Sequence, residues 1–273
     1  MRNILKTSGC PFSHGDSSCH GHTPKRVEWD YENDAESGEA LVFFDFDCRG
    51  GFGRNEEIKK FLWLCESRDI TKPAHIEVFQ NRDEFFECYD AIFTCDESLI
   101  EMDDRFIKVP NGSNKHWVED HGIHDKNKLI SMFCSGKANC NGHLIRNNVA
   151  VHYRDKVDLY GRGINPVDRK EEGLNDYMFS IAMENSVYDT YYTEKLLDCF
   201  ATGTVPIYWG CQSIGNHFNP DGIIMLNDEF DIDNINEDLY HSMKDAIEEN
   251  YEKCMDIEMA DDLVHDKIME IMS

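Results

Sequence analysis

A run of polar side chains from Glu184 to Lys195 has the residue types needed to hold an anionic ligand. It follows an apolar run at 178–183 and precedes a helix-like run that stops at Gly203. Lys195 falls in the expected first turn of that helix, so its ammonium group and the unpaired N–H groups of the turn would face the same anion. This arrangement suits a phosphate or diphosphate. The candidate ligand-binding residues here are Asn185, Ser186, Tyr191, Thr193, Glu194 and Lys195.

The hydrophobic pattern predicts the elements that must position these residues. Residues 178–183 and 205–209 are apolar runs typical of buried strands, and residues 194–202 carry apolar side chains at helical spacing. Gly203 is a helix stop signal. The segment therefore predicts a β-loop-α-β unit, in which ligands bind at the carboxyl ends of the strands.

Strand-like and helix-like runs alternate along most of the chain, which predicts an α/β fold with two compact lobes. Residues 111–127 are polar and are expected to link the lobes, and residues 236–273 are expected to form helices that brace them. The first 40 residues are the least regular part. Further strands are expected at 41–46, 90–95, 106–110, 129–134 and 157–160, and helices at 55–61 (running into a strand that ends near Leu64), 73–86 and 142–153.

The chain from about 128 to 227 resembles glycosyltransferase family 10, the fucosyltransferases. The resemblance lies in ENS, six residues, TEK, a short helix, glycine and VPIYWG, together with Arg146-Asn147, the VDLYG run at 157–161 and the FNP run at 218–220. Four ordered matches are far more specific than any one short motif. The resemblance implies a GT-B architecture, with two Rossmann-type lobes and a cleft between them. Residues 1–115 would be the acceptor-side lobe and 116–235 the donor-binding lobe.

The resemblance also implies an activity, the inverting transfer of fucose from GDP-fucose to a hydroxyl of a glycan acceptor, with no essential cofactor or metal. In the family, the residues that match Arg146 and Lys195 contact the donor diphosphate, and those that match Asn185 and Tyr191 line the nucleotide pocket. Glu194 would stabilise positive charge on the sugar ring, or only compensate the helix dipole. By residue type alone, Arg146 and Lys195 could equally be surface cations.

An inverting transfer needs a general base that takes the proton of the acceptor hydroxyl. Glu66 follows the apolar run 61–65, so it is expected at a strand end of the first lobe. The family has a glutamate in a comparable place, although the residues around it here, CESR, depart from the family's pattern. We predict that Glu66 is the base, with a surface glutamate as the alternative interpretation.

Asp45 and Asp47 offer a competing interpretation. An Asp-x-Asp at a strand end is how metal-dependent GT-A glycosyltransferases hold a divalent cation, and on a strand the two carboxylates would share a face. That site would leave the TEK cassette without a role, so we predict no essential cation and near-neutral effects of Asp45→Asn and Asp47→Asn. A non-catalytic nucleotide-sugar binder is a third hypothesis, against which the intact Arg146 and Glu194-Lys195 argue.

Charge and composition limit the partners. The formal net charge is -26, which disfavours nucleic acid and anionic membrane surfaces. No apolar run approaches the roughly 20 residues of a membrane span, and the first residues have too short an apolar core for a signal peptide. We therefore expect a soluble, cytoplasmic protein without a transmembrane segment.

The 11 cysteines are scattered, and we expect most of them to be reduced core residues. The start of the chain is rich in cysteine and histidine, residue types that bind zinc. Their spacing matches no finger or ribbon pattern, so a surface loop is the preferred interpretation over a metal site. The residues concerned are Cys10, His14, Cys19, His20 and His22.

Overall fold

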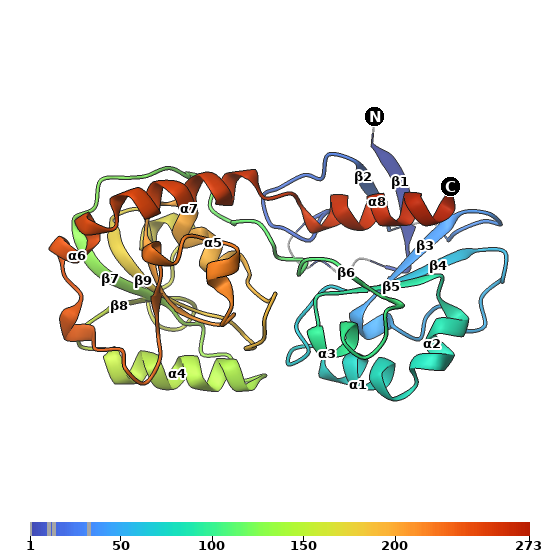
Figure 1. The fold of residues 1–273 in the computed structure, drawn as a ribbon, viewed down its shortest axis with the longest axis horizontal. Coiled ribbons are helices and arrows are strands. Elements are labelled where there is room, and N and C mark those ends of the chain that lie inside the picture. The colour runs from blue at the N-terminus through green and yellow to red at the C-terminus, as the bar shows by residue number, and fades with distance from the viewer. Residues whose placement is uncertain (1, 10–11, 13–14, 32–33) are drawn as a thin grey trace. The chain divides into compact units, whose positions relative to one another are not determined.

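The computed structural model describes residues 2–9, 12, 15–31 and 34–273, and the chain divides into two compact units (Figure 1). The first unit comprises Met1–Asn114 and Glu258–Ser273, and the second comprises Lys115–Ile257. Each unit has its own parallel sheet covered by helices. The predicted α/β fold is therefore confirmed.

The first unit has a six-stranded sheet in the order β2-β1-β3-β4-β5-β6, with every neighbouring pair parallel. The strands are β1 (Asn3–Thr7), β2 (Val27–Asp30), β3 (Ala40–Phe44), β4 (Lys59–Leu64), β5 (Ala91–Thr94) and β6 (Phe106–Lys108). The helices are α1 (Lys72–Gln80), α2 (Arg82–Cys88), α3 (Glu97–Ile100) and α8 (Ala260–Met272).

Helices cover both faces of this first sheet. Phe61 and Trp63 of β4 pack on one face in a cluster that includes Val264 of α8. Leu62 of β4 packs on the other face in a cluster that includes Val78 of α1. Because successive strand residues point to opposite faces, a strand buried on both sides must be apolar throughout, which is why β3 and the end of β4 are continuous apolar runs.

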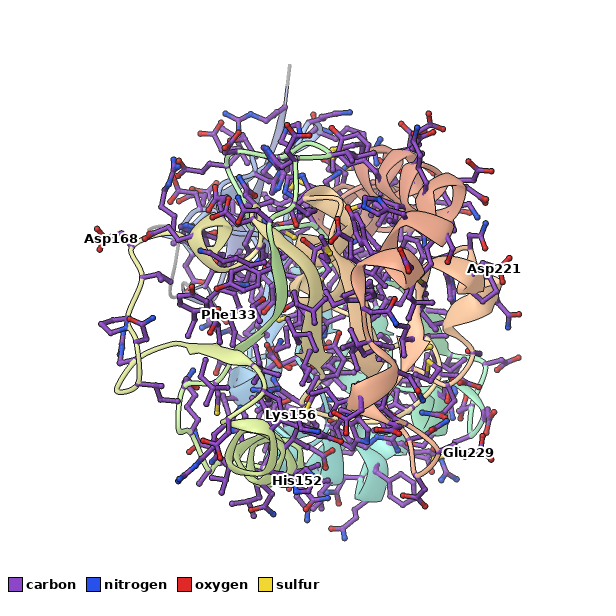
Figure 2. All side chains as sticks on the ribbon, turned by 90° about the vertical axis from the view of Figure 1, so that its left-hand side faces the viewer. Phe133, His152, Lys156, Asp168, Asp221 and Glu229 are labelled. Atoms are coloured by element: carbon purple, nitrogen blue, oxygen red, sulfur yellow. The ribbon has the colours of Figure 1, made fainter. Side chains whose placement is uncertain are left out.

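The second unit has a five-stranded sheet in the order β11-β10-β9-β7-β8, again with parallel neighbours. Figure 2 looks onto this unit, with Phe133 marking the end of β7 and His152 the last turn of α4. The strands are β7 (Lys128–Phe133), β8 (Asp158–Tyr160), β9 (Tyr177–Met183), β10 (Val205–Trp209) and β11 (Ile224–Met225). The helices are α4 (Asn141–Tyr153), α5 (Glu194–Ala201), α6 (Glu237–Ser242) and α7 (Lys244–Asp256).

The strand order of the second unit creates a position for a ligand. The first strand, β7, lies between β8 and β9, so the chain leaves β7 towards one edge of the sheet and leaves β9 towards the other. The loops that follow β7 and β9 therefore diverge, and in open α/β sheets ligands bind at such a switch point. The predicted strands and helix of the donor cassette, β9, α5 and β10, are confirmed.

One predicted helix of the first unit is wrong, and another is divided in two. Residues 55–58 form a turn rather than a helix, and β4 begins at Lys59, which pairs with Ala40 of β3. A short apolar run cannot separate helix from strand by periodicity, and here the partner strand decides. The expected helix at 73–86 is two helices that meet at Asn81, whose φ of -118° is not helical.

The first 40 residues, expected to be irregular, contain β1 and β2. These strands pair with each other in parallel, and β1 also pairs with β3. Cys10 and His14 lie outside the described residues. Cys19 is buried and donates its thiol hydrogen to the carbonyl of Gly112 at 3.0 Å. Within the described ranges no three histidine, cysteine or carboxylate side chains are grouped as metal ligands would be.

The C-terminal helices are divided between the units. Helices α6 and α7 belong to the second unit and α8 to the first. Asp261 in the first turn of α8 accepts hydrogen bonds from Trp29 Nε1 at 2.8 Å and from the backbone N–H of Ser18 at 3.1 Å. None of the helices in the described ranges is both long enough and apolar enough to cross a membrane.

Candidate active site

The predicted ligand-binding residues of the second unit gather at the switch point between β7 and β9. Helix α4 begins there after the β7 loop, and α5 begins there after the β9 loop. The two segments touch at Gly142, where an added Cβ would lie 2.3 Å from the carbonyl oxygen of Asn185. Only glycine permits this approach, so Gly142 brings the start of α4 against the loop that carries the polar cassette.

Arg146 fastens α4 to the end of β9. Its side chain is buried, and Nη2 donates to the carbonyl oxygens of Met183 at 2.6 Å and Glu184 at 3.2 Å, and to Oδ1 of Asn185 at 3.0 Å. All of these bonds use one nitrogen of the guanidinium group. The alternative interpretation of Arg146 as a surface cation is therefore wrong, and its Nε and Nη1 donors have no protein partner within the described residues.

Lys195 stands among buried polar groups at the start of α5. Its Nζ lies 3.0 Å from Glu194 Oε1, 3.0 Å from Thr193 Oγ1 and 3.7 Å from Glu184 Oε2. The side chain keeps 22% of its surface exposed, whereas that of Glu184 is fully buried. Thr193 caps the helix, and its N–H and hydroxyl donate to the Glu184 carboxylate at 2.8 and 2.7 Å.

The charges of this cluster depend on one another. Burial opposes the charge of Lys195, but the carboxylates of Glu194 and Glu184 outweigh it and raise the lysine pKa. Burial would also raise the pKa of Glu194, but Lys195 and Lys170 lower it to about 2. Burial raises the pKa of Glu184. The start of α5 therefore holds a fixed ammonium ion whose positive charge Glu194 partly balances.

The loop after β9 contains an unsatisfied hydroxyl group. Ser186 is 2% exposed, and its buried Oγ has no hydrogen-bond partner in the described part of the chain. Such groups are rare, and they mark places where a ligand or an ordered water supplies the partner. Thr190 in the same loop has a φ of 66°, which is strained for a β-branched residue. The loop is therefore held in a costly conformation beside the switch point.

Tyr191 is a buried packing residue of this loop. It is 1% exposed, and its ring stacks on Tyr188 at 4.9 Å between centroids. Asn185 is half-buried and is oriented by Arg146. In this structure Tyr191 presents almost no surface to a ligand, whereas Asn185 keeps part of its surface exposed.

Sequence reasoning missed Lys170, which lies in a short 3-10 helix (Lys170–Gly173) far from the motif. Its Nζ pairs with Asp198 of α5 at 2.5 Å, lies 3.9 Å from Glu194 Oε1, and sits 4.7 Å from the centre of the Trp117 ring. Lys170 is thus a second cation beside Glu194. No local pattern marks it, because only the folded chain brings residues 170 and 194 together.

His143, also missed, occupies the first turn of α4. Its ring is buried, and Nδ1 accepts the backbone N–H of Asn139 at 3.2 Å. Burial, with the nearby positive charges of Arg146, Lys137 and Lys195, lowers its pKa to about 4. The ring is therefore neutral at pH 7, and an acceptor at Nδ1 implies a proton at Nε2.

This neutral histidine predicts a pH effect on stability. Between pH 6.5, the usual pKa of histidine, and about pH 4, this ring is protonated in the unfolded chain but not in the folded chain. The free energy of unfolding therefore falls as the pH is lowered through that window. In His143→Asn the side-chain oxygen can still accept from Asn139, but nothing titrates. We expect urea unfolding at pH 7 and pH 4.5 to show a smaller loss in the variant, by at most about 3 kcal/mol. The exposed-residue control His152→Asn should match the wild type, and an unchanged loss in His143→Asn would contradict the assignment.

In the first unit, Glu66 directly follows β4. Its backbone N–H donates to Asp45 Oδ1 at 3.3 Å, and its own Oε2 accepts the N–H of Ser67 at 3.0 Å. The side chain is half-buried. The predicted placement of Glu66 at the carboxyl end of a strand is therefore confirmed, while its catalytic role stays a prediction.

The expected shared face of Asp45 and Asp47 is wrong. Strand β3 ends at Phe44, and Asp45, with a φ of 25°, begins a 3-10 helix (Asp45–Asp47). Asp45 is buried and accepts from Cys65 Sγ at 2.8 Å and Thr71 Oγ1 at 3.2 Å. Burial raises the pKa of Asp45. Asp47 is exposed and accepts from the hydroxyl of Ser8. The two carboxylates therefore have separate environments and separate partners.

These environments predict different costs for the two amide substitutions, in place of the near-neutral effect expected for both. Asp45→Asn replaces one of the two carboxylate oxygens by an NH₂ group, which cannot accept a hydrogen bond from the buried donors. We therefore expect a loss of about 1–3 kcal/mol in the free energy of unfolding. Asp47→Asn, at the surface, should stay within about 0.5 kcal/mol of wild type. Urea unfolding of both variants, with and without a chelator, measures this. A chelator effect that Asp47→Asn removes would instead indicate a metal site.

One family model matches a stretch that lies within the second unit. The model of the family described as "Glycosyltransferase family 10 (fucosyltransferase) C-term" matches residues 123–255. An α-(1,3)-fucosyltransferase of Helicobacter pylori is 39% identical over 62 residues, and a putative fucosyltransferase of Acanthamoeba polyphaga mimivirus is 33% identical over 97. These alignments span 23% and 30% of this chain, but only 13% and 16% of the relatives' own lengths.

Solved structures show the fold. An α1,3-fucosyltransferase crystallised with GDP superposes with a TM-score of 0.53 at 16% identity, covering 99% of this chain and 89% of that one. A mutant of TarM from S. aureus, crystallised with UDP, gives a TM-score of 0.53 at 10% identity and covers 85% of this chain and 55% of that one. Both are GT-B glycosyltransferases, which confirms the predicted GT-B type of fold with its two Rossmann-type units.

Proposed function

We propose, from the premise that residues 123–255 are a glycosyltransferase family 10 C-terminal domain, that this chain is an inverting fucosyltransferase that moves fucose from GDP-fucose to a glycan hydroxyl. One observation carries the proposal. The switch point of the second unit brings together the ammonium ion of Lys195, the N-terminus of α5 and the unsatisfied buried hydroxyl of Ser186.

These groups fit a diphosphate leaving group. As the bond between the anomeric carbon and the donor diphosphate breaks, negative charge grows on the phosphate oxygens, and preorganised donors stabilise it. Lys195 and the N-terminus of α5 offer fixed positive charge. Arg146 has its Nε and Nη1 donors left for the same anion, and the hydroxyl of Ser186 can donate as well. The chain as a whole has a net charge of -26, which repels an anionic nucleotide sugar. A local group of positive charges and hydrogen-bond donors is therefore needed for it to bind.

The acceptor step needs a base, and we assign it to Glu66. The acceptor hydroxyl attacks the anomeric carbon on the face opposite the diphosphate, its proton passes to the Glu66 carboxylate, and GDP leaves with the bonding electrons. This single displacement inverts the anomeric configuration. The bond from the Glu66 N–H to buried Asp45 supports this role, because it fixes the backbone that carries the base.

We also propose that transfer needs no divalent cation. Asp45 is already hydrogen-bonded to a thiol, a hydroxyl and a backbone N–H, and Asp47 lies apart from it at the surface. The charge that a metal ion supplies in a GT-A enzyme would come here from Lys195 and Arg146.

The test is a titration of the purified chain with GDP, UDP and CMP, by calorimetry and thermal shift, with and without a chelator. Selective, chelator-insensitive binding of GDP supports the proposal. A preference for UDP, or a requirement for a cation, would overturn it. Incubation with GDP-fucose and a panel of glycans then follows, and NMR of the new anomeric proton reports inversion. GDP-fucose binding without turnover on any glycan would indicate a non-catalytic binder.

A further inference from the structure

A pocket of about 340 Å³ lies in the first unit, outside every site described so far. The loop after β4, helix α1 and the start of α3 line it, near the carboxyl ends of β4 and β5, and Figure 1 shows α1 and α3 in the same part of this unit. Its volume is within the range of about 300–1,000 Å³ typical of small-molecule sites. The first lining residue, Arg68, is two positions beyond Glu66. We call this cavity the α1–α3 pocket.

His75 gives the pocket an unsatisfied acceptor. Its Nδ1 lies 3.1 Å from Asp96 Oδ2, and since a carboxylate only accepts, Nδ1 carries a proton; in the neutral ring, Nε2 then has the lone pair. The residue is 5% exposed, and Nε2 is buried with no hydrogen-bond partner within the described residues. A buried acceptor of this kind calls for a ligand that donates, such as a hydroxyl group.

Asp96 is held as an anion, which fixes the orientation of His75. It accepts from the N–H and hydroxyl of Ser98 at 3.0 and 2.7 Å, and Arg68 Nη2 lies 3.2 Å away. Burial opposes its charge, but the bonds from His75 and Ser98 and the charge of Arg68 lower the pKa of Asp96. The His75–Asp96 pair is therefore preorganised.

Apart from His75, Asp96, Arg68 and Ser98, the pocket is lined by Lys72, Asp69, Gln80 and the apolar side chains of Ile76, Phe79 and Leu99. Lys72 is exposed and has no ion-pair partner in the part of the chain that the structure describes, so its ammonium group is available to a ligand. Ile76 and Phe79, three residues apart on α1, are 42% and 48% exposed. A pyranose ring has apolar C–H faces and a rim of hydroxyls, and an acidic pyranose adds an anion. The C–H face suits Phe79, a hydroxyl suits the acceptor of His75, and the anion suits Lys72.

We propose that the α1–α3 pocket binds an anionic pyranose, a sugar residue that carries a carboxylate or a sulfate. Lys72 faces the anionic group, His75 Nε2 accepts a bond from a ring hydroxyl, and Phe79 packs against the C–H face of the ring. That this sugar is part of the acceptor glycan rests on the proposed transferase function; the binding itself does not.

The test uses the full chain labelled with ¹⁵N-histidine and titrated with methyl β-D-glucuronopyranoside, glucose 6-sulfate and methyl β-D-glucopyranoside to tens of millimolar. The His75 signals are assigned by their loss in His75→Asn. We expect the His75 Nε2 resonance to move with each sugar, and at least one anionic sugar to bind about fivefold more tightly than the neutral one, the advantage that one partly exposed ion pair provides. The ranking of the two anionic sugars identifies the preferred group.

Variants separate the contacts. Lys72→Met should abolish the preference for anionic sugars, and Phe79→Ala, at a half-exposed position, should weaken all three by about fivefold. Lys25→Met removes an exposed lysine of the same unit outside the pocket and should change nothing. Equal affinities for all three sugars, no shift at His75, or a preference that survives Lys72→Met would overturn the inference.

The same samples are titrated with GDP to keep the two proposals apart. GDP binding without any response of His75 to a sugar overturns this inference and leaves the proposed function standing. A response of His75 to an anionic sugar without any GDP binding supports the pocket and overturns the proposed function.

Discussion

Replacing Lys195 by methionine is expected to slow transfer from GDP-fucose by about 100-fold or more and to weaken GDP binding, because it removes the fixed charge at the start of α5. The substitution also leaves the buried carboxylates of Glu184 and Glu194 without their shared cation. Removing one partner from a buried ion pair costs about 3–5 kcal/mol, although Lys170 beside Glu194 softens that loss.

A double variant separates catalysis from folding. Adding Glu184→Gln to Lys195→Met removes one stranded carboxylate, so we expect it to recover part of the stability but none of the transfer rate. Thermal unfolding and steady-state kinetics on the same preparations measure the two effects. Lys128→Met, which breaks a surface ion pair with Asp176 in the same unit, is the control and should be near neutral. A rate that returned with stability would show that Lys195 acts only on the fold.

Glu66→Gln is expected to leave GDP affinity unchanged and to lower turnover by about 100-fold or more, because an amide cannot take the proton of the acceptor hydroxyl. The fold should tolerate the change. The side-chain oxygen of glutamine can still accept from the N–H of Ser67, and the bond from the Glu66 N–H to Asp45 uses the backbone.

The measurement pairs calorimetry with GDP and turnover of GDP-fucose with an acceptor found in the glycan screen. Glu87→Gln, an exposed glutamate of α2 in the same unit, serves as the control and should keep wild-type turnover. Normal turnover in Glu66→Gln would exclude it as the base and direct attention to other carboxylates at the strand ends of the first unit.

The sequence predicted the donor cassette closely because its signals are local and agree with one another. The strand expected at 178–183 is Tyr177–Met183, and the helix expected at 194–202 is Glu194–Ala201. Gly203 ends that helix with a φ of 66°, a conformation that glycine adopts without strain. The hydrophobic pattern of neighbouring residues is enough to indicate buried strands and an amphipathic helix, so no distant contact is needed to recognise them.

Prediction failed where a distant partner decides the structure. Residues 55–61 have apolar spacing compatible with a helix, but pairing with β3 makes Lys59–Leu64 a strand. The Asp45 and Asp47 carboxylates look equivalent in the sequence, yet the chain turns after Phe44 and buries only the first. In each case the energy of pairing or burial outweighs a weak local preference.

By itself, the sequence determined the α/β class, the cassette from β9 to β10 and the placement of Lys195 at a helix start, because hydrophobic period and glycine positions encode them. Only the tertiary structure decided three contacts. Arg146 Nη2 donates to the carbonyl oxygen at the end of β9, Lys170 lies beside Glu194, and His75 and Asp96 form a pair in a pocket. These contacts join residues that are 21 to 37 positions apart in separate elements, and their strength depends on burial. Burial is a property of the whole fold, and no stretch of neighbouring residues specifies it.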